Sequence, residues 1–172
     1  AGTNPLSDRA FGIVESNGFT GASGVGKGYF GWRLANSTGS TISSISVTWT
    51  GEQWRKENNA AAHSLNLFYQ QAAFAGLTAG TWTSAGSTFT SPIIGATAAA
   101  ILDGNAPANR IAGITVTITV SIPAGQEITL RWEDLNDAGN DHFMAIDDVT
   151  VNATLAAASA PTVTTPTAAD IT

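Results

Sequence analysis

Short stretches in which apolar residues alternate with threonine or serine recur along this chain. In ITVTITVSI (114–122), Val116, Ile118 and Val120 share one phase, and threonines occupy the other. Because successive side chains of a β-strand point to opposite faces, this pattern predicts strands with one buried face. Further stretches of this kind lie at 44–50, 63–70, 127–132 and 145–151. No segment has a convincing helical period, so we expect a chain built of strands.

Turn-rich pieces containing Gly, Pro, Asn and Asp separate these stretches. Many short strands, spaced roughly ten residues apart, predict an all-β fold, namely an antiparallel β-sandwich of the jelly-roll type. The chain has 172 residues, enough for one domain with a core and short for two. We therefore expect one β-sandwich module over 1–151. From Asn152 the composition shifts to Thr, Ala and Pro, which predicts that 152–172 is a linker or the start of a following immunoglobulin-like or fibronectin-like repeat.

Composition excludes several classes of function. The formal charge is −6 and only seven Lys and Arg residues are scattered along the chain, so we expect no nucleic-acid partner. No apolar run approaches the ~18 residues of a spanning helix, so we expect no membrane insertion. The chain has no Cys, and its two histidines, His63 and His142, accompany no G-x-S-x-G motif. His142 beside Asp141 has the chemistry of a general base, but a hydrogen-bonding role is commoner, and we predict that the chain is not an enzyme.

The segment RWEDLNDAGNDHFMAIDD (131–148) holds six of the thirteen acids. Two carboxylates about 5 Å apart repel by about 3 kcal/mol at an effective dielectric near 20, so such crowding requires either full solvation or a counter-charge. One interpretation is a solvated acidic turn paired with Arg131 or Arg110. The other is a calcium site, because calcium takes six to eight oxygen ligands and Gly139 permits the sharp turn of a binding loop. The predicted metal ligands are Asp134, Asn136, Asp137, Asp141, Asp147 and Asp148.

Among these residues, Asp148 is the best additional ligand outside the loop. It follows the apolar Ile146 by two positions, so a regular strand would bring its charge close to the core.

Four tryptophans have distinct expected roles. Trp49 and Trp132 are in phase with aliphatic neighbours and are predicted to lie in the core. Trp54 and Trp82 lie in or beside turns, where an exposed ring can stack on the apolar face of a sugar. For Trp54 the alternative is that its ring packs under its own loop. The predicted ligand-binding residues are therefore Trp54 and Trp82.

Several motifs together resemble a known type of domain. The stretches TGEQWR, LDGNAPANR and RWEDLNDAGNDHFMAIDD are similar to an uncharacterised jelly-roll-like domain of large secreted or surface-attached bacterial proteins, over roughly Asp8 to Val151. The sequence departs from that pattern at Phe143, where relatives have glycine. The ending AIDDV also resembles, more weakly, the last strand of calcium-binding jelly-roll carbohydrate-binding modules, and this similarity implies an ion held by Asp147 or Asp148.

The expected function follows from these observations. We predict a non-catalytic, calcium-stabilised extracellular or cell-surface module of a larger bacterial protein, acting in adhesion, matrix assembly or polysaccharide binding. Its expected partners are polysaccharide or other surface proteins. One alternative is an accessory substrate-binding domain of a secreted hydrolase such as a nuclease, phosphatase or glycosidase. Another is a self-assembling structural subunit whose C-terminal tail adds a strand to a neighbour's sheet.

Overall fold

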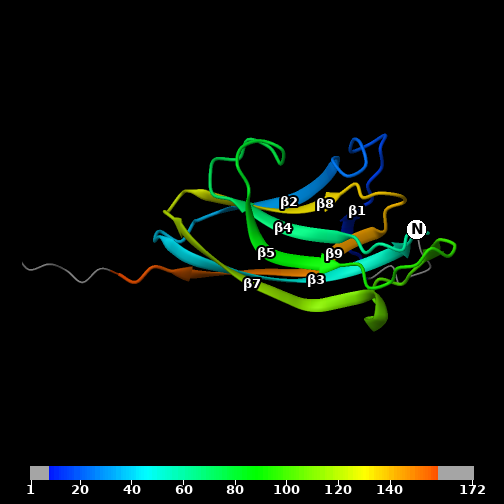
Figure 1. Cartoon of the computed structure of the whole chain (residues 1–172). Coiled ribbons are helices and arrows are strands. Elements are labelled where there is room, and N and C mark those ends of the chain that lie inside the picture. Colours follow the sequence, from blue (N-terminus) through cyan, green and yellow to red (C-terminus); the bar gives the residue numbers. More distant parts are fainter. Residues whose placement is uncertain (1–7, 159–172) are drawn as a thin grey trace, which may run out of the picture.

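The protein is a sandwich of two antiparallel β-sheets (Figure 1). The computed structural model describes residues 8–158. The elements are β1 (Phe11–Ile13), β2 (Lys27–Ala35), β3 (Ile42–Lys56), β4 (Ser64–Gln70), β5 (Thr83–Thr90), β6 (Ala100–Ile101), the 3-10 helix η1 (Pro107–Asn109), β7 (Arg110–Ile122), β8 (Glu127–Leu135) and β9 (Phe143–Leu155). No helix in this part of the chain is long and apolar enough to cross a membrane.

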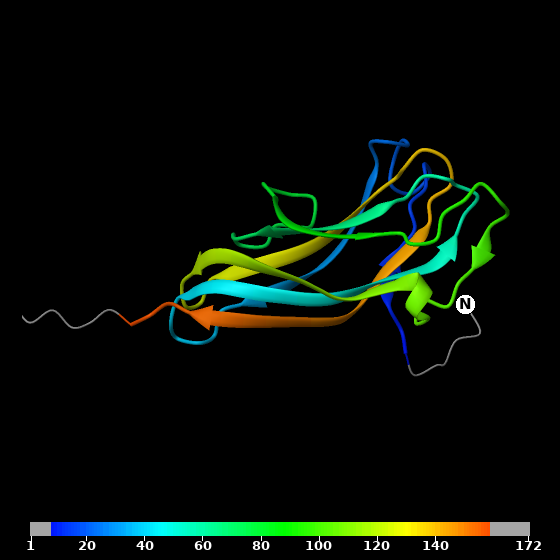
Figure 2. The same cartoon turned by 60° about the horizontal axis from the view of Figure 1, so that its bottom comes forward.

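The strand order is that of a jelly roll, as the sequence predicts. One sheet has the order β1-β9-β3, with β7 and the two-residue β6 both pairing with β3. The other has the order β2-β8-β4-β5. The two layers lie face to face, with β7, β3 and β9 opposite β5, β4, β8 and β2 (Figures 1 and 2). The first and last strands share one sheet, but β1 pairs only with the start of β9, and β9 runs on to Leu155 at the opposite end of the sandwich (Figure 1).

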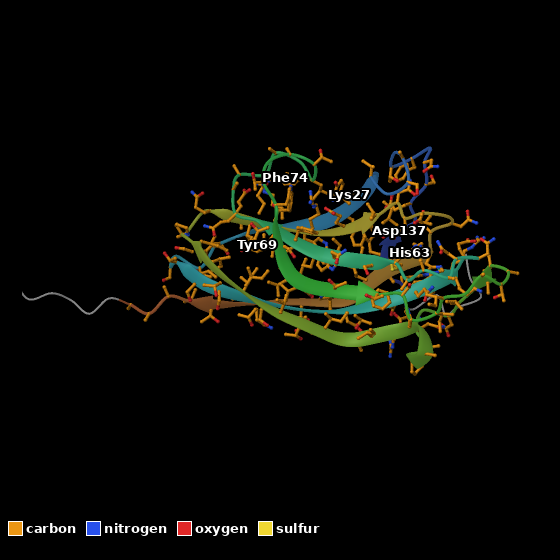
Figure 3. The ribbon with its side chains drawn as sticks, viewed as in Figure 1. Lys27, His63, Tyr69, Phe74 and Asp137 are labelled. Atoms are coloured by element: carbon orange, nitrogen blue, oxygen red, sulfur yellow. The ribbon has the colours of Figure 1, made fainter. Side chains whose placement is uncertain are left out.

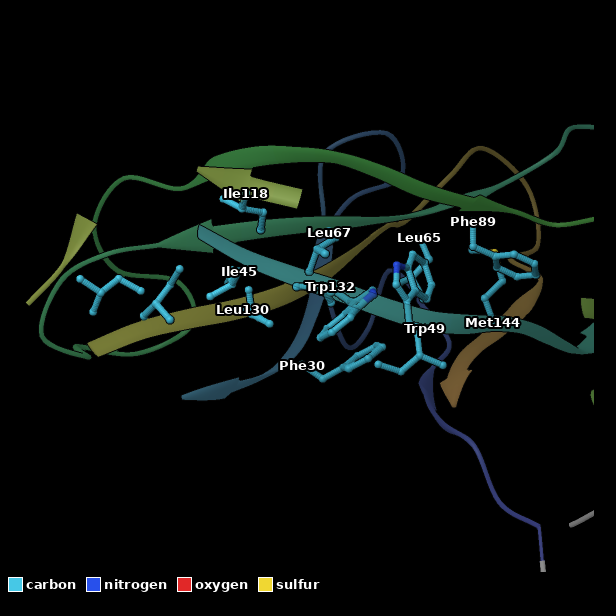
Figure 4. Close-up of a cluster of buried hydrophobic side chains, with 14 of the residues drawn as sticks. Phe30, Ile45, Trp49, Leu65, Leu67, Phe89, Ile118, Leu130, Trp132 and Met144 are labelled. Atoms are coloured by element: carbon cyan, nitrogen blue, oxygen red, sulfur yellow. The ribbon is translucent and has the colours of Figure 1, made fainter. Parts of the chain in front are cut away.

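The core lies between the sheets and consists of the alternating apolar residues (Figure 4). Trp49 and Trp132 are fully buried, which confirms their predicted place in the core. Their rings meet edge to face at 5.7 Å, and Phe30 stacks on Trp132 with ring centroids 6.2 Å apart. Each such side chain contributes about 1.5–3 kcal/mol through burial.

One predicted turn is a strand. Trp54, in TGEQWRKENN (50–59), was expected to lie in or beside a turn, but β3 continues to Lys56 because the first half of β9 pairs with it up to Arg55. Gly51 permits a close approach between the sheets, since a Cβ there would overlap the Phe89 ring. Trp54 therefore lies on a strand and not in a turn.

An irregularity in β9 decides where two acids point. Thr48 pairs with Thr150 and Thr50 pairs with Asp147, so three steps of β9 oppose two of β3. This extra residue is a β-bulge, and Asp148 has a φ of 52°, in the left-handed region. After the bulge, Val149 packs against the core again.

The last strand extends beyond the predicted domain boundary. β9 runs to Leu155, and the residues from Asn152 onward pair with the start of β3. The Ala156 amide then donates to the Thr41 carbonyl at 2.8 Å. The first residues of the predicted linker are therefore part of the sandwich, whereas 159–172 lie outside the described residues.

The edge beside β1 is only partly covered. β1 pairs with Met144–Ile146 alone, so among residues 8–158 the rest of β9 has β3 as its single strand partner. Inward-facing side chains of β2 and β9 meet at this edge and line an apolar slot of about 250 Å³. The residues that line it are Trp32, Leu34, Val149 and Val151.

Candidate functional site

Four acids gather at one end of the sandwich, where the β1–β2 and β8–β9 loops meet (Figure 3, near Asp137 and His63). We call them the acid pocket: Glu15, Asp134, Asp137 and Asp141. No Lys or Arg of the described chain forms an ion pair with any of the four. The hollow beside them has a volume of about 440 Å³, and Glu15 and Asp141 are among its lining residues. Arg55 also lines this hollow, but its ion pair is with Glu57 and not with an acid of the pocket.

Asp134 points into the sandwich. It continues the inward phase of Trp132 on β8 and is 1% exposed. Its Oδ2 has no hydrogen-bond partner. Burial raises the pKa of Asp134 to about 9, and repulsion from Glu15, Asp141 and Asp137 adds to the effect of burial. Without a bound cation, this carboxyl is therefore protonated at neutral pH.

Glu15 lies beside the residue pair that Gly28 of β2 forms with Asp134 of β8. It follows β1, is 4% exposed, and neither carboxylate oxygen has a hydrogen-bond partner. The nearby Thr20 hydroxyl donates to the Ser16 carbonyl at 3.1 Å. A Cβ on Gly28 would overlap the Glu15 carboxyl, and Gly28 is the residue paired with Asp134. Burial raises the pKa of Glu15, the nearby Thr20 hydroxyl partly offsets this rise, and the charge of Asp141 raises the pKa further.

Asp137 and Asp141 bring the loop acids against a histidine. His63 Nδ1 is 3.7 Å from Asp137 Oδ2 and 3.5 Å from Asp141 Oδ1. These three donor atoms lie within 4.8 Å of one another, the only such trio of His, Asp or Glu found in residues 8–158. Asp141 Oδ1 also accepts the Asp137 amide at 2.8 Å, which closes the loop. Gly139, with a φ of 98°, makes the turn that the sequence predicts.

Both histidines serve as buried, neutral hydrogen-bonding groups. His63 Nδ1 accepts the His142 amide at 3.2 Å, and the two rings lie 4.6 Å apart. His142 Nδ1 accepts the Glu57 amide, so its Nε2 carries the proton and donates to the Ala61 carbonyl at 3.2 Å. Burial lowers the pKa of each. The Nδ1 lone pair of His63, which faces the acids, is therefore already used, so only oxygen atoms remain as ligands for a cation.

Asn136 holds the facing loop in place. Its Nδ2 donates to Asn17 Oδ1 at 2.9 Å and to the Gly21 carbonyl at 2.6 Å, and its amide donates to the Gly26 carbonyl. Asn136 was predicted to bind the metal, and of its side-chain atoms only Oδ1 remains available for this. Asn136 thus positions the β1–β2 loop that carries Glu15.

Asp147 and Asp148 lie in different surroundings. Because of the bulge, Asp148 is exposed, so the expectation that its charge comes close to the core is wrong. Its amide donates to Asp147 Oδ1 at 2.7 Å, and Thr50 Oγ1 donates to its Oδ2 at 3.2 Å. Burial raises the pKa of Asp147, and a hydrogen bond with Asp8 raises it further. The structure thus brings Asp134, Asn136, Asp137 and Asp141 together and places Asp147 and Asp148 apart from them.

Neither predicted arginine partner reaches the loop acids. Arg131 pairs with Glu133 at 2.9 Å, and its guanidinium lies between the rings of Tyr29 and Trp82, at 4.3 and 4.1 Å from their centroids. Arg110 lies 4.0 Å from Glu52. Arg131 thus pairs with one acid of the 131–148 segment, Glu133, and neither arginine forms an ion pair with Asp134, Asp137 or Asp141. One face of Trp82 is covered by Arg131.

Trp54 is partly buried on the outer face of β3. Its Nε1 donates to Glu52 Oε2 at 2.9 Å, and Gly104 packs closely on its ring. Burial raises the pKa of Glu52 to about 7. Arg55 pairs with Glu57. The rest of the Trp54 ring lines a groove.

Sequence reasoning missed Glu15, although a signal was present. Glu15 follows Ile13 by two positions, as Asp134 follows Trp132, so both acids continue an inward-facing phase. An acid in that phase is a candidate for burial. What the sequence lacks is any sign that β1 and β8 end at the same place.

No protein-family model, curated protein or solved structure matches this chain. The resemblance to a domain of bacterial surface proteins therefore stays a prediction, and any assignment of function depends on the geometry of the site.

Proposed function

We propose that this chain is a non-catalytic, calcium-stabilised module that works outside the cell, in adhesion, matrix assembly or polysaccharide binding. One observation carries the proposal: two acids, Glu15 and Asp134, are almost fully buried side by side with unpartnered carboxylate oxygens. Buried polar groups of folded proteins are nearly always paired, so an unpaired buried acid indicates a missing partner.

Energetics favour a cation as that partner. Two carboxylates about 5 Å apart repel by about 3 kcal/mol at an effective dielectric near 20, and burial adds a desolvation cost. Protonation relieves part of this cost, as the raised pKa of Asp134 shows. A divalent ion relieves it at neutral pH without requiring a proton, and its binding free energy then adds to folding stability.

The donor set suits a hard cation. Glu15, Asp134, Asp137 and Asp141 offer carboxylate oxygens, whereas His63 Nδ1 already accepts a backbone amide. Calcium prefers such oxygen donors and tolerates irregular geometry, whereas zinc favours nitrogen and sulfur. Calcium sites of extracellular modules bind with Kd values of about 10⁻⁴–10⁻³ M, which suits a role outside the cell.

Thermal unfolding tests the site directly. At a calcium concentration about 100-fold above its Kd, the free energy of unfolding should rise by about 2.7 kcal/mol, which for a module of this size raises Tm by about 5–10 °C relative to chelator. Zinc should give a smaller shift. In Glu15→Gln the calcium shift should vanish, because the substitution removes a ligand charge and keeps the side-chain shape. A wild-type Tm that is the same in chelator and in calcium would refute the proposal.

Self-association is a second candidate, favoured by the open edge of β9. The stretch from Val149 to Leu155 carries no charged residue and no proline, the two devices that usually protect an edge strand. The apolar slot containing Trp32 lies beneath it. An added strand would cover both. The tail that we predicted to supply this strand lies outside the described residues.

Light scattering at rising protein concentration separates this candidate from a monomeric module. If the edge pairs, the mass should exceed that of a monomer, and Val151→Lys should restore the monomer by placing a charge in the slot. Thr150→Lys, on the exposed face of the same strand, is the matched control. A wild-type chain that stays monomeric at millimolar concentration argues against self-association.

A further inference from the structure

A groove on the outer face of the β3–β9 sheet has a chemistry opposite to that of the acid pocket. It has a volume of about 320 Å³ and lies beside Trp54. Its lining includes no acidic residue, although the whole chain carries a formal charge of −6. The lining residues are Arg9, Ala10, Trp54, Arg55, Ile101, Phe143 and Ala145.

The aromatic wall of the groove is held in a fixed orientation. Trp54 Nε1 donates to the buried Glu52 at 2.9 Å, and Gly104 packs so closely on the ring that a Cβ there would overlap it. The backbone of Trp54 is fixed too, because its carbonyl accepts the Leu102 amide at 2.9 Å. A ring held in this way needs no ordering when a ligand stacks on it, which lowers the entropy cost of binding.

Two guanidinium groups give the groove its charge. Arg9 is exposed, and no ion pair joins it to another residue of 8–158. Arg55 pairs with Glu57 and is also half exposed, so part of its fork is free. Guanidinium groups bind carboxylates through charge-assisted and often bidentate hydrogen bonds. Ile101, 72% exposed, and Phe143 add apolar surface beside them.

We propose that this groove binds an acidic sugar unit of a polysaccharide, with the apolar face of the sugar ring on Trp54 and its carboxylate on Arg9 and Arg55. The combination selects the ligand class. A neutral sugar would leave the arginines without an anion, and a small anion would leave the aromatic wall uncovered. Arg55 also lines the hollow beside the acid pocket, whereas Arg9, Trp54 and Phe143 line only the groove, so the ligand contacts proposed here require no calcium.

Calorimetric titration with short oligogalacturonates tests this proposal. The titration uses the whole chain in chelator, where calcium cannot bridge carboxylates. Saturable binding is expected, and Arg9→Gln should weaken it about tenfold through loss of a charged hydrogen bond. Arg33→Gln, which removes an exposed arginine from the other sheet, is the matched control and should bind as the wild type does. Phe143→Ala should also weaken binding.

The remaining arms decide what the groove recognises. Dextran, which is neutral, should not bind. Dextran sulfate separates a general polyanion site from a carboxylate site. If dextran sulfate binds as tightly as oligogalacturonate, and Arg33→Gln weakens its binding as much as Arg9→Gln does, the proposal is overturned. Absence of oligogalacturonate binding would overturn it too. Because Tm with and without calcium is measured on the same samples, failure of the groove leaves the calcium proposal standing, and the reverse also holds.

Discussion

Asp134 and Asp148 occupy equivalent positions in the sequence and very different positions in the structure. Each follows a buried core residue by two places, Trp132 in β8 and Ile146 in β9. Asp134 keeps the inward phase because β8 pairs without interruption on both sides. Asp148 loses it because β9 bulges at that point. The comparison teaches that strand phase places a side chain only as long as the ladder stays regular.

Neutralising each acid in turn gives the largest test of this contrast. In calcium, Asp134→Asn should lose the stabilisation by the ion, about 2.7 kcal/mol, because a buried ligand charge is removed. Asp148→Asn should change the free energy of unfolding by less than about 0.5 kcal/mol, as expected for an exposed residue. Urea denaturation with and without calcium measures both values. Equal losses in the two variants would contradict the division into two groups.

The pH dependence of the stability of the calcium-free protein sharpens the comparison between Asp134 and Asp148. The folded state keeps the Asp134 proton up to about pH 9, whereas the unfolded state releases it near 3.8, so stability falls as pH rises through this window. Lowering the pH from about 9 to about 7 should therefore raise the free energy of unfolding by about 2 kcal/mol.

Further acidification brings in an opposing effect. Burial lowers the pKa of His63 and of His142 in the folded state. Below about pH 6.5 the unfolded state therefore takes up protons on these histidines that the folded state does not, and this opposes the gain in stability. Glu52, whose pKa burial raises to about 7, adds to the gain as the pH falls below about 7, so denaturant midpoints should rise less steeply with acidification below pH 6.5 than above it. Asp134→Asn should flatten the upper part of the curve, and an unchanged curve in that variant would count against a buried acid there.

A change at Gly28 probes the contact between β2 and Glu15. In Gly28→Ala the added Cβ meets the Glu15 carboxyl, which is the mobile end of a side chain and so can move away. Calcium affinity should fall about tenfold, or about 1.4 kcal/mol, while the fold persists. Gly18→Ala is the matched control, since a Cβ there meets nothing within 4 Å. Titration calorimetry compares the two, and equal calcium affinities would show that Glu15 takes no part.

The smallest expected effect concerns the bulge itself. Asp148→Val places a β-branched residue at a positive φ and should cost about 1 kcal/mol. Asp148→Gly removes the same hydrogen bond with Thr50 without that strain, so the difference between the two variants isolates the backbone conformation. Urea midpoints provide the measurement. Two variants of equal stability would mean that Asp148 does not adopt the left-handed conformation.

Much of the fold could be predicted from sequence because its signals are local. Alternation with a period of two located parts of β3, β4, β7, β8 and β9 and placed Trp49 and Trp132 in the core. The same reasoning failed where pairing with a distant strand decided the outcome. β3 continues past Gly51 because β9 pairs with it there, and no residue of TGEQWRKENN reveals that partner.

The candidate site divides in the same way. The sequence by itself indicated that six acids cluster within 131–148 and that Gly139 turns their loop, and it led to the prediction of calcium. Only the tertiary structure added Glu15, buried Asp134 beside it, and moved Asp148 out to solvent. The physical reason is that side-chain phase is set within a few residues, whereas burial and charge neighbours are set by the strand that lies alongside.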